Sequence, residues 1–189
     1  ETSADFSWIA WHGHPSVITG LVVLTGAYLL GVGPLRQRFG LAQHVGYGQV
    51  AFFLTGILVI CIALLSPLHE LGDEFLLSAH MVQHLLLTLV VPPLLLLGTP
   101  HWLLRPLLSP PRAMKVARFL TSPVVAFILF NAVLVVWHVP ALYDQALREQ
   151  GVHILEHLMF IVAGVIMWWP ILSPLPEIPR SSYLVLMGY

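Results

Sequence analysis

Long apolar runs alternate with short polar stretches along almost the whole chain. The hydrocarbon core of a bilayer needs about 20 mainly apolar residues per helix, and five windows meet this requirement. They are Pro15 to Gly33, Val45 to Leu65, Phe75 to Gly98, Pro123 to Pro140 and Val152 to Leu172. A sixth apolar run starts at Ser182 and continues to Tyr189. The pattern predicts an all-α, polytopic transmembrane helical bundle with five complete spans and the start of a sixth.

Two features modify this scheme. Pro92 and Pro93 interrupt the third window, and we expect them to bend that helix or to end it early, because proline lacks the backbone N–H. The sixth run is only half a span, which cannot satisfy its backbone polar groups in lipid by itself. We therefore interpret residues 1–189 as a single transmembrane domain that is incomplete at its C-terminus.

Composition supports a membrane protein and excludes several other classes. Hydrophobic residues make up 58% of the 189 residues and charged residues only 9%, whereas soluble domains carry about 25% charged residues. The net charge of −1 offers no attraction for a nucleic acid. The single cysteine, Cys61, excludes an internal disulfide framework and a metal site built from cysteines.

The charged residues of the loops orient the predicted bundle. The loops after the first and third windows are basic, and the loop after the second window is acidic. The basic residues are Arg36, Arg38, Arg105, Arg112, Lys115 and Arg118, and the acidic ones are Glu70, Asp73 and Glu74. Because Lys and Arg mark the cytoplasmic side, we expect an extracytoplasmic N-terminus.

The ten histidines are distributed unevenly in this topology. Only His44 and His101 fall on the cytoplasmic side. The other eight, which we take as candidate metal ligands, fall in the outer half: His12, His14, His69, His80, His84, His138, His153 and His157. Ionisable residues inside a membrane are costly and are usually functional.

Two pairs among these histidines have the spacing of neighbours on one helical face. His80 and His84 are four residues apart, as are His153 and His157, and i,i+4 side chains lie together on a helix. Imidazoles from two helices suit copper, zinc, iron or nickel. Glu156 can orient an imidazole from the second ligand shell, and the Met81 thioether can add a soft contact that favours copper(I).

The same residues allow other interpretations. The string from His153 to His157 matches the H-x-x-E-H pattern of inverted zinc proteases, but three fixed positions are weak evidence. Paired histidines could also bind haem b, or titrate in a proton- or ion-coupled transporter. His138 could simply cap its helix, where a cation is favourable.

Two sequence blocks resemble the signatures of the CtaG family of cytochrome c oxidase assembly factors, of the polytopic, Bacillus-like type. The first is Ser78-Ala-His-Met-Val-Gln-His-Leu-Leu-Leu87, followed by Pro92-Pro-Leu-Leu95 and Leu97-Gly-Thr-Pro100. The second is Trp137-His-Val-Pro-Ala-Leu-Tyr-Asp144 together with Val152-His-Ile-Leu-Glu-His-Leu158 and Trp168-Trp-Pro170. The resemblance extends through essentially the whole chain.

This resemblance implies a bundle of about seven helices in the bacterial plasma membrane. It also implies a non-enzymatic copper-binding role in maturing the copper centre of a haem–copper oxidase at the extracytoplasmic face. The expected partners are membrane lipid, the oxidase subunits that carry the copper centre and other copper chaperones. The alternatives are a haem b or quinone-linked electron carrier and a copper importer. Copper(I) or copper(II), and one ion or two, stay open.

Overall fold

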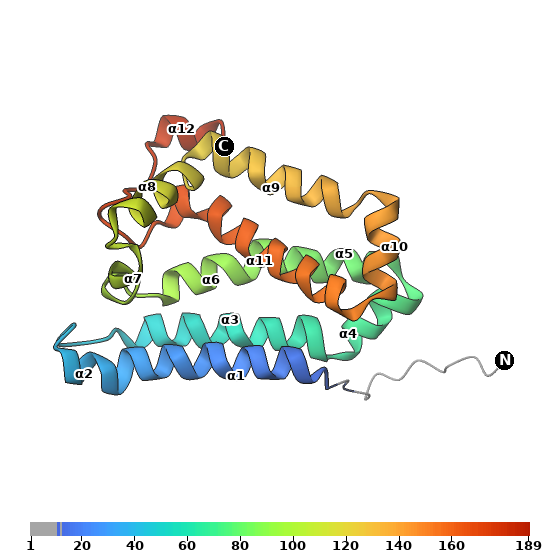
Figure 1. Cartoon of the computed structure of the whole chain (residues 1–189), viewed down its shortest axis with the longest axis horizontal. Coiled ribbons are helices and arrows are strands. Elements are labelled where there is room, and N and C mark those ends of the chain that lie inside the picture. Colours follow the sequence, from blue (N-terminus) through green and yellow to red (C-terminus); the bar gives the residue numbers. More distant parts are fainter. Residues whose placement is uncertain (1–10, 12) are drawn as a thin grey trace.

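The computed structural model describes residue 11 and residues 13–189, and within them every regular element is helical (Figure 1). The α-helices are α1 (Pro15–Leu30), α2 (Arg36–Phe39), α3 (Tyr47–Leu65), α4 (Pro67–Glu70), α5 (Leu77–Leu85), α6 (Val91–Gly98), α7 (His101–Leu108), α8 (Pro111–Leu120), α9 (Pro123–Trp137), α10 (Pro140–Arg148), α11 (Gln150–Leu172) and α12 (Tyr183–Met187). Three π-helical turns join some of them: η1 (Gly31–Leu35), η2 (Leu71–Phe75) and η3 (Leu86–Val90).

Four helical stretches of the described residues are long and apolar enough to cross a membrane. They are Pro15–Phe39, Tyr47–Leu65, Leu77–Gly98 and Gln150–Leu172. A fifth is possible if α8 and α9, which meet at an angle of 72°, form one broken span. The predicted fourth span is represented by α9, whose 15 residues are about 22 Å long at 1.5 Å per residue. The all-helical class is confirmed, and the number of complete spans stays a prediction.

The first span is longer than predicted because it passes through a proline. Pro34 lies inside η1, where the wider π-helical turn accommodates the missing N–H, and α2 then continues to Phe39. Gly40 ends the helix with a φ of 59°, the left-handed conformation that glycine adopts at helix C-termini without steric cost. The Arg36 guanidinium donates to the carbonyl oxygens of Ala42 and Gln43 at 3.0 and 2.6 Å, which secures the following loop.

The third span continues past its prolines to Gly98, where the predicted window ends. Of the two expectations for Pro92 and Pro93, a bend or an early end, the early end is wrong. The helix runs to Gly98 because a neighbouring helix compensates for the proline. Pro92 cannot donate to the carbonyl of Thr88 four residues earlier, and the Trp168 indole of α11 donates to that oxygen at 3.2 Å. Gly164 makes the approach possible, since an added Cβ would lie 2.7 Å from Pro92 Cγ and 3.0 Å from the Thr88 oxygen.

A second close contact joins the first three spans. The Tyr28 hydroxyl of α1 donates to the Gly98 carbonyl of α6 at 2.8 Å. The Tyr28 ring stacks on Phe53 of α3 with 3.7 Å between the centroids. A side chain at Gly98 would meet the Phe53 backbone, with Cα at 2.7 Å from the added Cβ. The spans are thereby held in a fixed register along the bundle.

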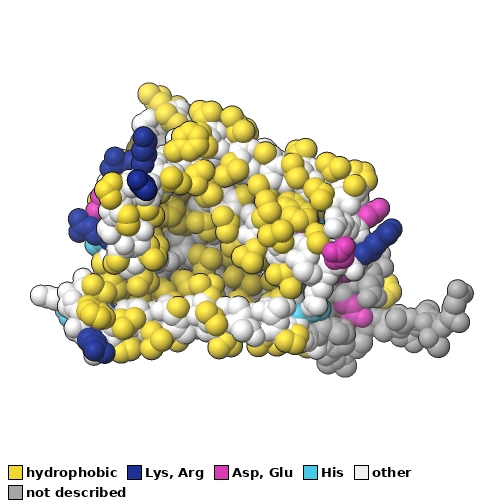
Figure 2. Space-filling model, viewed as in Figure 1, with side chains coloured by type: hydrophobic (Ala, Val, Ile, Leu, Met, Phe, Trp, Pro, Cys, Tyr) yellow, Lys and Arg dark blue, Asp and Glu magenta, His cyan; other side chains and the backbone are white. Residues whose placement is uncertain are grey.

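The surface has apolar sides and charged ends (Figure 2). Basic residues gather at the end that carries α2, α7 and α8, and acidic residues are more frequent at the end that carries α4 and α10. The side between them is mostly apolar, with exposed residues such as Val22, Leu58, Phe127 and Leu158. This distribution is the one expected of a bundle that crosses a bilayer.

We expect Gly164→Ala to destabilise the bundle. Overpacking of a close contact costs about 1–3 kcal/mol, and the new methyl would collide with the proline break of the third span. The measurement is the midpoint of thermal unfolding in detergent, which should fall. Gly151→Ala on the same helix is the matched control, because nothing lies within 4 Å of its added Cβ. A Gly164→Ala variant as stable as the wild type would contradict the packing described here.

Candidate metal centre

Seven imidazoles converge at the end of the bundle that carries α4, α10 and the first turns of α5 and α11. They come from the N-cap of α1, from α4, α5 and α11, and from the C-cap of α9. Successive ring centroids form a connected series: His14–His69 5.0 Å, His69–His153 5.3 Å, His153–His157 4.4 Å, His157–His84 5.8 Å, His84–His80 4.1 Å and His84–His138 5.8 Å. Histidines from five parts of the sequence therefore form one cluster.

The two i,i+4 pairs face each other across the interface between α5 and α11. His80, His84, His153 and His157 are all buried, as expected for side chains that share the inward face of each helix. The His80 and His153 ring centroids are 6.4 Å apart, so the two pairs are close across this interface. Both pairs lie at the same end of the bundle, in the first turns of α5 and α11.

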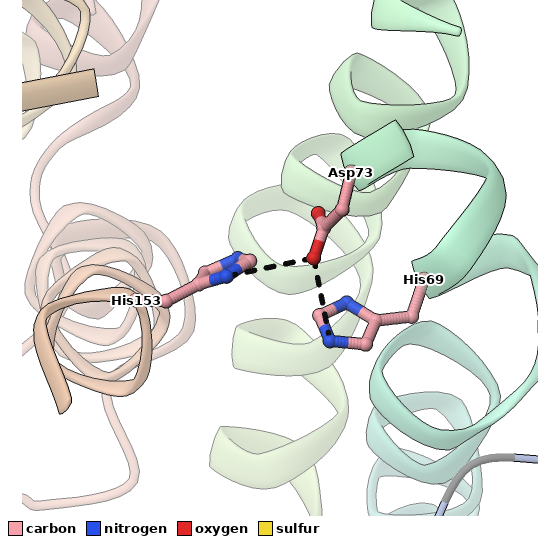
Figure 3. A group of neighbouring side chains, drawn as sticks. All are labelled: His69, Asp73 and His153. Carbon is pink, nitrogen blue, oxygen red and sulfur yellow. Dashed lines mark ion pairs between the residues drawn. The ribbon is translucent and has the colours of Figure 1, made fainter. Parts of the chain in front are cut away.

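A first potential ligand set lies near the end of the bundle (Figure 3). We call it the outer set; it consists of His69, Asp73 and His153. Oδ2 of Asp73 lies 3.5 Å from Nε2 of His69 and 3.5 Å from Nδ1 of His153. Gly72 brings η2 against α5, because an added Cβ would lie 2.9 Å from the backbone nitrogen of His80. This close approach positions the Asp73 carboxylate among the imidazoles.

A second set lies deeper in the bundle. We call it the inner set; it consists of His80, His84 and Glu156, whose exposed fractions are 1%, 4% and 1%. Nε2 of His84 lies 3.8 Å from Oε1 of Glu156. Both ring nitrogens of each histidine and both oxygens of Glu156 are buried without a hydrogen-bond partner among the described residues. Leaving such groups unsatisfied is costly, and a cation bound between the three side chains would satisfy one nitrogen of each imidazole together with the carboxylate.

The groups outside the membrane-spanning helices have pKa values suited to metal binding. Burial lowers the pKa of His69 below its usual value, and the Asp73 carboxylate offsets this only in part. Burial alone would raise the pKa of Asp73, but His80, His69 and His153 hold it below its usual value. A neutral imidazole beside an ionised carboxylate is the protonation state that ligates a metal.

A pocket leads from the surface to the outer set. Its volume is about 430 Å³. Its lining includes His14, His69, Asp73, His153 and His157. The inner set does not line this pocket, so the two sets differ in access from the aqueous side.

Other predicted site residues occupy less central positions. His14 lies beside His69 and shares a hydrogen bond of 3.2 Å with Gln150. His138 is exposed and its Nδ1 lies 2.7 Å from the Leu134 carbonyl, as expected of the capping role, although its ring also faces His84. Met81 is half-buried and lies about 100° around the helix from His80. His12 lies outside the described residues.

Three residues have a larger part in the cluster than the sequence indicated. The sequence indicates Asp73 only as an acidic loop residue and Glu156 only as a group that orients an imidazole, yet each offers a potential ligand atom. Gln83 carries no prediction; it is fully buried and its Nε2 lies 3.0 Å from Nδ1 of His69. The available signal was spacing, since Asp73 is four residues after His69 and Gln83 is three after His80.

The fold and this cluster define a helical membrane protein with a buried histidine–carboxylate centre near one end. The model of the family described as cytochrome c oxidase caa3 assembly factor (Caa3_CtaG) matches residues 26–189. The chain therefore belongs to this family, and the resemblance inferred from the sequence blocks is confirmed.

Mycobacterial proteins are among the relatives of this chain. Uncharacterized proteins of Mycobacterium bovis and Mycobacterium tuberculosis are each 30% identical to it over 177 residues, covering 86% of this chain and 26% of theirs. An uncharacterized protein of Mycobacterium leprae is 29% identical over 182 residues, covering 88% and 27%. The chain spans about a quarter of the length of these relatives. No solved structure matches it.

We expect Asp73→Asn to lower the pKa of His69 further in the metal-free protein. The carboxylate is the largest influence that raises this pKa, and an amide carries no charge to replace it. The measurement is a pH titration of the imidazole NMR resonances, with the His69 signal assigned by its loss in His69→Gln. Asp144→Asn, at an exposed position of α10, is the control. An unchanged or raised His69 pKa in Asp73→Asn would contradict the described contact.

Proposed function

We propose that this chain binds copper as its cargo at the histidine–carboxylate cluster and supplies it to the copper centre of a cytochrome c oxidase. Membership of the assembly-factor family supports the oxidase as the partner. The observation that carries the copper assignment is the inner set, in which six buried side-chain nitrogen and oxygen atoms have no hydrogen-bond partner among the described residues. The proposed role is that of a non-enzymatic chaperone.

The donor atoms favour copper among the ions considered. Imidazole nitrogens suit copper, zinc, iron and nickel, and copper(II) has the highest affinity of the divalent ions for a nitrogen site. Each set combines two imidazoles with one carboxylate and leaves coordination positions open. An open site can release its ion to a partner more readily than a closed four-ligand cage.

The charge distribution supports delivery at the extracytoplasmic face of the bacterial plasma membrane. Every Lys and Arg except Arg148 lies in or beside α2, α7, α8 or the segment after α11. These elements form the end of the bundle opposite the imidazole cluster (Figure 1). By the positive-inside rule, the basic end is cytoplasmic. The cluster and the N-terminus then face the outside, where a partner's copper site is accessible.

The geometry favours a compact ion over haem. The two rings of each i,i+4 pair are 4.1 and 4.4 Å apart. His80 and His84 belong to a set with Glu156, and His153 of the second pair belongs to a set with Asp73. A flat macrocycle needs single axial ligands on opposite sides of its plane, and carboxylates are not the usual haem ligands. Copper import is the remaining alternative and would require passage through the apolar bundle.

We expect the double substitution His80→Ala, His84→Ala to weaken copper binding by at least about tenfold, because even second-shell changes cost 10- to 100-fold in metal affinity. The full chain is purified, loaded with copper, dialysed and analysed for metal content. The matched control is His44→Ala, His101→Ala, which removes two imidazoles from the other end of the bundle.

Three outcomes would contradict the proposal. Unchanged copper content in the His80, His84 variant would show that the cluster does not hold the ion. A Soret band in the purified chain would indicate haem instead. Copper accumulation inside sealed vesicles that contain the chain would indicate an importer. Loss of oxidase copper in cells that carry the variant would support delivery.

A further inference from the structure

The carboxylate of Asp73 lies between the outer and inner sets. Its Oδ2 faces His69 and His153 of the outer set at 3.5 Å each. Its Oδ1 lies 3.5 Å from Nδ1 of His80, which belongs to the inner set. A carboxylate whose two oxygens point to different groups of donors has the arrangement of a bridge between two cations.

The two sets supply more donors than one ion uses. They share no residue, and each provides three ligand atoms within 4.8 Å of one another. Nitrogen-rich sites typically coordinate four ligands, with metal–nitrogen bonds of about 2.0–2.1 Å. Six residues divided into two groups, with the imidazole of His157 as a seventh donor beside them, fit two ions better than one.

The two sets also differ in access. The outer set lines the pocket of about 430 Å³, and His69 and Asp73 are half-buried. The inner set lies behind it with exposed fractions of 1% to 4%. An ion arriving from the aqueous side therefore meets the outer set first, and an ion in the inner set has lost more contact with water.

His157 is suited to connect the two positions. Its ring lies 4.4 Å from that of His153 in the outer set and 5.8 Å from that of His84 in the inner set. Its Nε2 is buried without a hydrogen-bond partner among the described residues. The same imidazole can therefore coordinate at either position while an ion exchanges one set of ligands for the other.

We propose that the cluster is a two-ion store, in which an exchangeable outer copper site and a retained inner copper site are bridged by Asp73. This inference rests on the proposed copper-binding function. Loading proceeds from the pocket through the outer set to the inner set by ligand exchange, and release follows the reverse order. No change of oxidation state is required.

The test is a copper(II) titration of the full chain, followed by removal of loose metal with a weak chelator. The wild type should bind two ions, and their magnetic interaction should broaden the electron paramagnetic resonance signal. The outer variant, His69→Ala with His153→Ala, should bind one ion with a narrow signal. The inner variant, His84→Ala with Glu156→Gln, should also bind one ion, which the chelator removes faster than the ion of the outer variant.

The Asp73→Asn variant tests the bridging carboxylate while the imidazole ligands of both sets stay in place. Loss of the shared carboxylate should remove or weaken the outer ion by at least about tenfold while the inner ion is retained. Circular dichroism of each variant checks that the helices remain folded. The control variant, His44→Ala with His101→Ala, should still bind two ions. A lower copper content in this control would show that one ion is bound adventitiously at the surface. That result would overturn the proposal.

The outcomes distinguish the two-ion store from the underlying function. One tightly bound ion in the wild type, lost in both the outer and inner variants, would overturn the store but leave copper binding intact. Loss of both ions in each folded variant would overturn the existence of two separable sites. No retained copper in the wild type would refute the proposed function itself.

Discussion

The close approach of α11 to the proline-interrupted span α5–η3–α6 is the contact on which the rest of the structure depends. Pro92 leaves the carbonyl of Thr88 without its helical partner, and lipid offers no water to replace it. The Trp168 indole supplies the missing donor, and Gly164 allows the two backbones to meet. The same alignment places the histidine pair of α5 opposite the histidine pair of α11, so one packing solution determines both the bundle and the cluster.

Burying the polar side chains of this cluster costs free energy that an apolar core would not cost. Buried imidazoles and carboxylates need partners, because the low dielectric of the interior makes each unpaired polar group expensive. The inner set has no hydrogen-bond partners among the described residues, whereas the spans around it satisfy their backbone groups internally. Polar residues of this kind within a membrane protein are usually retained for function. A cation bound between these side chains would be held by imidazole nitrogen and carboxylate oxygen together.

The location of the cluster suits an assembly factor of the oxidase. It lies near the end of the bundle, within reach of a pocket, so the proposed copper cargo would enter or leave without crossing the apolar centre. The π-helical turn η2 and the glycine before Asp73 bring a carboxylate to histidines of three helices, α4, α5 and α11.

The sequence by itself determined the helical class, the approximate span boundaries and the family, because apolar run length and the histidine blocks are local features. It also predicted that the i,i+4 pairs share helical faces, since helix geometry alone relates residues four apart. It did not determine that the third span continues past Pro92, that Asp73 lies between two ligand sets, or that Glu156 lies beside His84. These depend on contacts between residues that are far apart in the chain, such as Trp168 with Thr88 and Asp73 with His153. Only the packing of α11 against its neighbours decides them, because no local pattern specifies which helix satisfies a given orphaned group.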